Sequence, residues 1–324
     1  MRAQLIVNPT AGGGLARKRV SAVTTALERA GVDFEWVETR GPRHATTLAT
    51  LALESEADCL VVVGGDGTLS EVCQACLRQE STRPDVRRSL DGAQSDRKRP
   101  RPRVALIPCG TGNDWSRTLG LPRSSEAAVA IIANGKVRPV DLGVLEFSQA
   151  GGHCARRAFI NLTSFGIGGL ADQLVSCSPK WMGGSAAFFW GALRALLRYK
   201  SVPAVVRVDG CVCLEAPILN VAIGNGRYFG GGMLIAPDAD PSDGLLDVVA
   251  LYDLSRAQGL ALAHKIYRGT HLGSPGVRVA RGRVVEAELL RPHEPLLVDA
   301  DGETPGTLPM RVSVIPAAID FCVP

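Results

Sequence analysis

Apolar residues recur along the first third of the chain in short runs, which are separated by longer stretches with helical spacing. The runs that predict strands are residues 5–7, 34–37, 59–63 and 104–108. The last two lack any alternation of polar and apolar positions, as expected for strands that are buried on both faces of a sheet. Helices are predicted between the runs, one with apolar positions at Val20, Val23 and Leu27 and another over residues 44–54. This order predicts βα units around a mostly parallel sheet.

The pattern changes near Val140, where strands and turns begin to dominate. Further strands are predicted at residues 158–162, 204–208, 218–223, 245–251 and 311–315, with helical stretches near 181–199 and 255–268. We therefore predict a fold of the α/β class with two domains. A three-layer α/β domain with a mostly parallel sheet takes residues 1–139 plus 311–324, and an antiparallel β-rich, sandwich-like domain takes residues 140–310.

Composition agrees with this division. A chain of 324 residues exceeds one average domain, and 46% hydrophobic with 21% charged residues is the balance of a globular protein. No apolar run reaches the roughly 20 residues that span a bilayer, and the chain starts in a strand without a signal-peptide pattern. The nine cysteines do not suggest a secreted disulfide scaffold. We expect a cytoplasmic protein.

Three glycine-bearing turns each follow a strand of the first domain, at residues 8–14, 64–68 and 110–114. Turns at the carboxyl ends of parallel strands meet at one edge of the sheet, where ligands bind. Glycine allows backbone N–H groups to approach a phosphate closely, and the N-terminus of a following helix favours anions. None of the turns has the P-loop spacing or the Gly-x-Gly-x-x-Gly pattern of dinucleotide-binding folds. The sequence thus predicts a phosphate site of another type.

Asp66 lies between glycines at the end of a buried strand. A carboxylate there is well placed to hold Mg²⁺, directly or through water, beside a nucleotide phosphate. The alternative is that Asp66 serves only as the N-cap of the next helix.

The chain resembles the diacylglycerol kinase catalytic domain family, which includes bacterial soluble diacylglycerol kinases, sphingosine kinases and ceramide kinases, within the NAD kinase-like superfamily. The resemblance rests on motifs that occur in the same order in that family, at residues 64–72, 107–114, 140–143, 159–162, 225–232 and 299–303. It implies an ATP- and Mg²⁺-dependent lipid kinase whose first domain binds the nucleotide. It leaves only residues 81–103 uncovered.

The resemblance also implies roles for residues. Asp66 and Asp114 would organise nucleotide and magnesium, and Asp301 would be the general base, supported by Glu303. The nucleotide contacts would fall on Asn8, Thr10, Gly64, Gly65, Gly67, Thr68, Glu71, Gly110, Thr111 and Asn113. A structural magnesium would lie on the second domain, bound by Asp240, Asp243 and the carbonyl of Leu245.

The residues by themselves leave alternatives open at these positions. Transfer of a phosphoryl group to an alcohol needs a carboxylate that accepts the proton, but Asp-Gly is a common turn and Asp299 is nearly as good a candidate as Asp301. Acidic turns such as residues 238–245 suit Mg²⁺ or Ca²⁺, yet are usually only solvated. The first glycine turn lacks a lysine, for which Arg17 or Lys18 would substitute.

Charge and aromatic residues point to a membrane partner. Residues 81–103 hold eight Arg or Lys and three Asp, a local charge of +5 within a net charge of +4. This flexible basic insertion is either a solvated loop or a contact with anionic lipid head groups, at about 1 kcal/mol per basic residue. Residues 181–200 concentrate aromatics before Arg194 and Arg198, which predicts a helix that either packs on the second core or touches the membrane. We expect peripheral association with the inner membrane face, no nucleic-acid partner, and a fold that allows a homodimer.

Two other functions remain open. An NAD kinase-like enzyme would share the Gly64 to Thr68 motif, although the 110–114 turn and Asp301 argue against it. A non-catalytic lipid-binding protein would be expected to have lost Asp66, Asp114 or Asp301, and all three are present. Among lipids, diacylglycerol ranks first, followed by ceramide or a sphingoid base.

Overall fold

The computed structural model describes residues 1–55, 57–81, 101–149, 152–170, 191, 195, 199–291 and 296–324. The chain divides into two compact units. Unit 1 consists of residues 1–110, 119–142 and 316–324, and unit 2 of residues 111–118 and 143–315. The sequence analysis placed residues 111–118 in the first domain, but they belong to unit 2, because Asp114 and Thr118 accept hydrogen bonds from the backbone of residues 231 and 227. Most of residues 81–103 and 181–200 lies outside the described residues.

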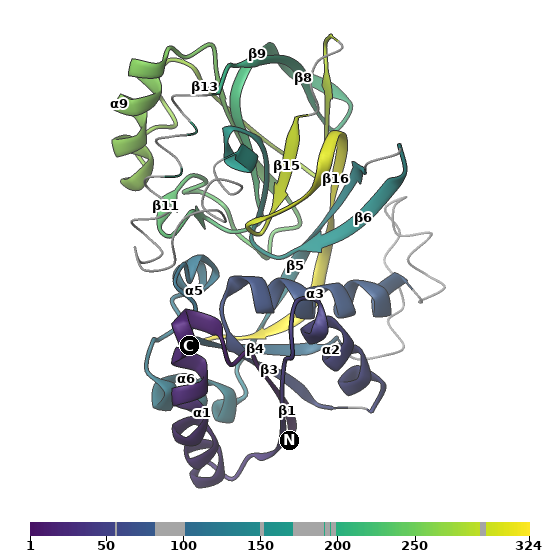
Figure 1. Cartoon of the computed structure of the whole chain (residues 1–324), viewed down its shortest axis with the longest axis vertical. Coiled ribbons are helices and arrows are strands. Elements are labelled where there is room, and N and C mark those ends of the chain that lie inside the picture. The colour runs from purple at the N-terminus through teal and green to yellow at the C-terminus, as the bar shows by residue number, and fades with distance from the viewer. Residues whose placement is uncertain are drawn as a thin grey trace. The chain divides into compact units, whose positions relative to one another are not determined.

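Unit 1 is built from alternating strands and helices (Figure 1). In chain order these are β1 (Arg2–Val7), α1 (Ala11–Arg29), β2 (Asp33–Glu38), α2 (His44–Glu54), β3 (Cys59–Gly64), α3 (Asp66–Ser81), β4 (Arg103–Pro108) and α6 (Ser125–Asn134), with the start of β5 (Val137–Ser148) and the end of β16 (Glu303–Cys322). The strands form a parallel sheet in the order β2, β1, β3, β4, β16. All six residues of β3 are buried. This confirms that the strand has both faces covered.

Helices cover the two faces of this sheet. α1 and α6 pack over one face through Val23, Leu27 and Ile132, against strand residues such as Leu5 and Val61. α2 and α3 pack against each other and contact β1 and β3. Successive side chains of a strand point to opposite faces, so Ile6 and Val62 face the second pair of helices. The predicted α/β class and the mostly parallel sheet are confirmed.

Unit 2 consists mainly of antiparallel strands. Its elements are α5 (Asp114–Leu119), β6 (Cys154–Phe159), β7 (Leu162–Gly166), β8 (Val202–Val208), β9 (Cys211–Gly224), β10 (Tyr228–Phe229), β11 (Met233–Leu234), β12 (Leu246–Tyr252), α9 (Arg256–Tyr267), β13 (Val277–Gly282), β14 (Val284–Leu289) and β15 (Leu297–Ala300), together with the remainder of β5 and β16.

Two long strands of unit 2 each pair with two neighbours in succession. β9 pairs with β8 through its first half and with β7 through its second half. β16 pairs in the same way with β15 and then with β14. Since β15 pairs with β7 and β14 with β8, the strands close around a buried core that includes Phe165, Val206 and Val298. This arrangement confirms the predicted antiparallel, sandwich-like domain.

One predicted strand is wrong in detail. Residues 158–162 were expected to form a single strand, but β6 ends at Phe159 and β7 begins at Leu162. The backbone N–H groups of this turn donate to the carboxylate of Asp301 instead of to a neighbouring strand. Among the helices in the described ranges, none is both long enough and apolar enough to cross a membrane.

Candidate active site

The three glycine turns begin at the carboxyl edge of the parallel sheet of unit 1. They leave the adjacent strands β1, β3 and β4, and the amide Nδ2 of Asn8 donates to Oγ1 of Thr68 over 2.9 Å. The backbone N of Cys109 donates to the carbonyl oxygen of Gly64 over 2.7 Å. The turns therefore lie side by side, as parallel pairing of the strands predicts.

Glycine is required where these turns touch. A Cβ on Gly12 would lie 2.0 Å from the carbonyl oxygen of Cys109, and one on Gly65 would lie 2.9 Å from Cα of Gly110. By contrast, no heavy atom lies within 4 Å of the positions that a Cβ would take on Gly13, Gly14 and Gly67. The turns thus pack tightly against one another on one side and border open space on the other.

The backbone of the first turn is left-handed over three successive residues. The φ angles of Gly12, Gly13 and Gly14 are +60°, +66° and +91°. Just before them, Oδ1 of Asn8 accepts hydrogen bonds from the backbone N and Oγ1 of Thr10, at 3.2 and 2.9 Å. Successive N–H groups in turns of this kind form concave sites that suit anions.

Asp66 is the first residue of α3 and is half-buried. It lies beside the predicted phosphate site, and it follows the N-cap position, which Gly65 takes. Its negative charge in the first turn favours the start of the helix.

The carboxylate of Glu71 binds the start of α2, whereas the sequence analysis predicted a contact with the nucleotide. Its Oε1 accepts a hydrogen bond from the backbone N of Arg43 at 2.9 Å, and its Oε2 accepts one from Ala45 at 3.0 Å. Both donors lie at the start of α2, where backbone N–H groups have no partner within the helix. Glu71 therefore holds the N-terminus of α2, and its predicted contact with the nucleotide is not supported by this geometry.

In unit 2, Asp301 organises the turn between β6 and β7. Its carboxylate accepts three backbone hydrogen bonds, from the N–H groups of Ile160, Asn161 and Leu162, at 3.0, 3.1 and 3.1 Å. Its own N–H donates to the carbonyl oxygen of Leu162, and its φ angle is +49°. Hydrogen bonds of this kind favour the ionised form of a carboxylate. Asp301 thus joins two segments that are 140 residues apart along the chain.

The same turn holds the start of the glycine-rich segment 225–232. The backbone N–H groups of Asn225 and Gly226 both donate to the carbonyl oxygen of Asn161, at 2.9 and 2.7 Å. The amide of Asn161 in turn donates to the carbonyl oxygen of Tyr228. A Cβ on Gly226 would lie 2.1 Å from Oδ1 of Asn161, so this position must be glycine.

Asp114 holds the far end of that segment. Its buried carboxylate accepts a hydrogen bond from the backbone N of Gly231 at 2.8 Å and pairs with Nη1 of Arg117 at 2.7 Å. The same Nη1 donates to the carbonyl oxygen of Gly112. Asn113 takes a left-handed conformation, with a φ angle of +52°. Arg117 thereby fastens residues 112–114, which follow the predicted nucleotide contacts Gly110 and Thr111.

Glu303 and Asp299 complete the acidic residues around this turn. Glu303 forms an ion pair with Arg157 of β6 at 2.8 Å. Asp299 is buried, and its Oδ1 accepts a hydrogen bond from the N–H of Gly302 at 2.9 Å. Because its side chain is buried beneath the turn, Asp299 is the weaker of the two candidates for contact with a substrate.

The residues predicted to hold a structural magnesium make contacts with other parts of the chain. Asp243 pairs with Nη2 of Arg281, whose Nε lies 3.1 Å from the carboxylate of Asp247. Oδ1 of Asp240 accepts from the N–H of Ser242, and Oδ1 of Asp243 accepts from that of Leu245. Within the described part of the chain, no three His, Cys, Asp or Glu side chains are grouped so that they could hold a metal ion. The guanidinium of Arg281 places a positive charge beside the predicted ligand Asp243, and the magnesium site itself stays a prediction.

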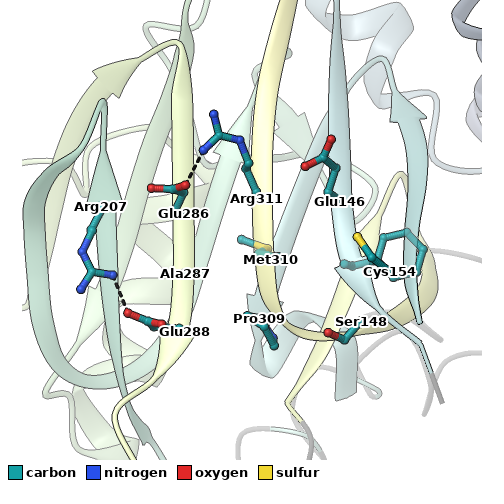
Figure 2. Close-up of a pocket in the computed structure, with 11 residues that line it drawn as sticks. Glu146, Ser148, Cys154, Arg207, Glu286, Ala287, Glu288, Pro309, Met310 and Arg311 are labelled. Carbon is teal, nitrogen blue, oxygen red and sulfur yellow. Dashed lines mark hydrogen bonds and ion pairs between the residues drawn. The ribbon is translucent and has the colours of Figure 1, made fainter. Parts of the chain in front are cut away.

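A surface pocket of about 500 Å³ lies on the strands of unit 2, and none of its lining residues belongs to these motifs. Figure 2 shows its side chains, which come from β5, β6, β8, β14 and β16. Its charges are paired across the strands, Arg207 with Glu288 and Arg311 with Glu286. Such ladders are typical of the solvent face of a sheet.

The sequence analysis missed the partners of the acidic residues. Arg117, Arg157 and Arg281 each pair with a residue that was singled out for its carboxylate. Only Arg117 gave a local signal, since it lies three residues after Asp114, a spacing that suits a pair on one helix.

Comparison with known proteins connects these features to a family. The diacylglycerol kinase catalytic domain matches residues 2–145, and the YegS C-terminal NAD kinase beta sandwich-like domain matches residues 161–323. Diacylglycerol kinase of Mycobacterium tuberculosis is 29% identical over 98% of this chain and 94% of its own. Diacylglycerol kinase of Bacillus subtilis is 28% identical over 95% and 91%.

Solved structures share the fold. The crystal structure of a diacylglycerol kinase from Bacillus anthracis covers all of this chain and 97% of its own, with a TM-score of 0.72 and 24% identity. Yeast NADH kinase in complex with NADH matches with a TM-score of 0.53 and 10% identity, over all of this chain and 84% of its own.

Proposed function

Because the chain belongs to the diacylglycerol kinase catalytic domain family and is a lipid kinase, we propose that it transfers the γ-phosphate of ATP to the hydroxyl group of diacylglycerol. The hydroxyl oxygen forms a bond to the γ-phosphorus, the bond from that phosphorus to the bridging oxygen breaks, and ADP leaves. The hydroxyl proton passes to a base. Diacylglycerol is the first choice because the curated relatives are diacylglycerol kinases.

The observation that carries the proposal is the cluster of glycine turns at the edge of the parallel sheet. Gly13 and Gly67 border open space, so no side chain of their own obstructs the approach of phosphate oxygens to the backbone there, whereas the N–H of Gly14 donates to the carbonyl oxygen of Thr10 and shapes the turn. Binding through the backbone would be indifferent to the base of the nucleotide and would fix the phosphates in place. Positioning of this kind supplies much of the rate in phosphoryl transfer.

Magnesium fits this edge through Asp66. A carboxylate is the hard oxygen ligand that Mg²⁺ prefers, and Asp66 is half-buried at the start of α3, directly after Gly65. When bound, the ion would neutralise charge on the phosphates. In this scheme Asp66 binds the ion and does not accept the proton of the lipid hydroxyl.

Asp301 is proposed as the acceptor that orients the lipid hydroxyl. Three backbone N–H groups donate to its carboxylate and hold it in place. An acceptor that orients the hydroxyl is sufficient because positioning and charge stabilisation supply most of the catalysis in phosphoryl transfer. Asp114 and Arg117 act differently, by fixing the backbone at Gly112 and Gly231.

A phosphate-transfer assay with radiolabelled ATP tests the proposal. The purified chain is incubated with Mg²⁺ and, separately, with diacylglycerol, ceramide, sphingosine and NAD. We expect label in phosphatidic acid, and none in that product from the isosteric variant Asp66→Asn, whose unchanged melting temperature is the control for folding. Label in NADP would instead assign an NAD kinase-like activity. Consumption of no ATP with any acceptor would favour a non-catalytic lipid-binding protein.

A further inference from the structure

One face of unit 2 combines positive charge with exposed apolar side chains. Residues 254–283, which contain α9 and β13, include six Arg or Lys and no Asp or Glu. Two of these cations are engaged, Arg281 with Asp243 and Asp247, and Lys265 with the hydroxyl of Ser274. Among the described residues, Arg256 and Arg268 form no ion pair. The segment therefore carries positive charge that the described part of the chain does not neutralise.

Helix α9 presents this charge in a defined pattern. Its inner side packs on the core of unit 2 through Leu262 and Ile266. Residues four apart share one side of a helix, so the outer side carries Arg256, Leu260, His264 and Arg268 in one row. All four are exposed, and Leu260 is 54% exposed. A single exposed leucine is ordinary on a protein surface, but this one lies between cations on a helix without acidic residues.

The helix is fixed firmly enough to serve as a docking surface. A capping box at its start pairs the side chain of Ser255 with the backbone of Gln258 and the side chain of Gln258 with the backbone of Ser255. At its end, Gly269 packs against Leu234 and Pro237. Figure 1 shows α9 on the outside of unit 2, beside β11 and β13. The exposed row thus belongs to an ordered helix.

The end of α9 lies within the electrostatic range of one acidic residue of unit 2. Tyr267, in the last turn, is 46% exposed. Partial burial, and then the negative charge of Asp114, raise the pKa of its hydroxyl. Asp114 in turn holds Gly231. A negative charge bound along α9 would therefore be felt by the side of unit 2 that holds the glycine-rich segment.

We propose that the outer side of α9 is the surface by which the enzyme docks on an anionic lipid bilayer, with Leu260 in the headgroup layer and Arg256 and Arg268 against anionic headgroups. Helices that lie in the membrane interface combine apolar side chains with Lys and Arg in this way. A nucleic acid would use the cations but would leave Leu260 in water. The inference rests on the proposed function, since a substrate dissolved in a bilayer must be reached at its surface.

Vesicle sedimentation of the full chain tests the surface without ATP. The vesicles are phosphatidylcholine, alone or with phosphatidylglycerol. We expect binding only to the anionic vesicles, and binding about 30-fold weaker for Arg256→Gln/Arg268→Gln, from about 1 kcal/mol per cation. The matched control, Arg29→Gln/Arg40→Gln, removes the same net charge from exposed positions of unit 1 and should bind like the wild type. The proposal would be overturned if neither double variant lost affinity for the anionic vesicles, or if both lost it to the same extent.

The apolar contribution has its own pair of variants. Leu260→Gln should weaken binding to anionic vesicles several-fold, whereas Val212→Gln, which changes a side chain that is 58% exposed on β9, should not. An unchanged Leu260→Gln variant would contradict insertion. Binding of a DNA duplex in place of vesicles, with the same dependence on Arg256 and Arg268, would identify a nucleic-acid surface and also overturn the proposal.

Activity separates this inference from the proposed function. With a short-chain diacylglycerol dissolved in water, the α9 variants should be as active as the wild type, whereas with vesicle-borne substrate they should be slower in proportion to lost binding. A loss that is equal for both substrates would refute docking. Normal vesicle binding without transfer of phosphate to any lipid would refute the proposed function and leave the docking surface standing.

Discussion

Replacement of Arg281 by leucine tests whether a guanidinium holds the 240–247 turn in place of a metal. The guanidinium bridges Asp243 and Asp247, and the side chain of Asp247 is only 6% exposed. Leucine fills part of the volume but removes the positive charge. The variant thus leaves the ionised carboxylate of Asp247 in the protein interior without its partner.

The magnitude follows from the burial of the two partners. Removing one member of a fully buried pair costs about 3–5 kcal/mol. The side chain of Arg281 is 42% exposed, so water can reach part of the space it leaves, and we expect a loss of about 2 kcal/mol in the free energy of unfolding. For a chain of 324 residues that lowers the melting temperature by roughly 3 °C.

The pH dependence distinguishes lost charge from lost packing. Burial raises the pKa of Asp247 above its usual value, while Arg281 lowers it. Without Arg281 the folded state binds the proton of Asp247 still more tightly than the unfolded state does. The stability that this proton binding contributes is lost as the pH rises through the folded pKa. The deficit of the variant relative to the wild type should therefore be full at pH 8 and shrink toward pH 5.

Thermal unfolding between pH 5 and pH 8, with and without excess EDTA, is the assay. Arg278→Leu, an exposed position on the same strand, is the control and should change the melting temperature little. A deficit for Arg281→Leu that does not vary with pH would refute the charge argument. A fall in the melting temperature of the wild type on addition of EDTA would show that a metal holds this turn after all.

Three further predictions concern other parts of the molecule. Gly12→Ala should weaken binding of a fluorescent ATP analogue and destabilise unit 1, because its Cβ meets the carbonyl of Cys109. Gly13→Ala has the same left-handed backbone but open space around the new Cβ, so it should cost only about 1 kcal/mol of stability. Equal effects of the two variants would contradict the close approach of Gly12 to Cys109. Glu71→Gln should cost about 1 kcal/mol at the start of α2, and so lower the melting temperature, while the KM for ATP stays unchanged. A higher KM for ATP at unchanged stability would instead support the predicted nucleotide contact of Glu71. Burial lowers the pKa of His271, so the folded state binds a proton there less tightly than the unfolded state does. The free energy of unfolding should therefore fall as the pH drops below about 6.5. In His271→Leu, the free energy of unfolding measured with urea should vary less between pH 7 and pH 5.

The sequence predicted those features that depend on local pattern. The buried runs at residues 59–63 and 104–108 lack alternation, and this signal for two-sided burial correctly predicted β3 and β4. The helical stretch near 255–268 likewise contains α9. The convergence of the glycine turns followed from one geometric rule, because the ends of parallel strands share an edge.

What the sequence could not supply are partners that are distant along the chain. The carboxylate of Glu71 bonds to Arg43, 28 residues away, and Asp243 bonds to Arg281, 38 residues away. β16 was predicted only at residues 311–315, since Gly306 and Pro309 interrupt the apolar pattern, yet its pairing with β15 begins at Glu303. In each case the residue type was informative, but only the fold determined what it binds.

Asp301 shows why a carboxylate that is identified by a motif can have two tasks. An aspartate that served only as a base would work best with few hydrogen bonds to its carboxylate, because each bond to the ionised form makes it less basic. Asp301 instead accepts three from the β6–β7 turn, whose residue Asn161 holds the start of the glycine-rich segment. The same carboxylate therefore determines the shape of the site in which it is proposed to act. We infer that Asp301→Asn, which sets an amide N–H₂ against backbone N–H groups, removes activity in two ways, by loss of the proton acceptor and by distortion of the turn. A loss of activity in this variant is therefore evidence about the chemistry only if its melting temperature is unchanged.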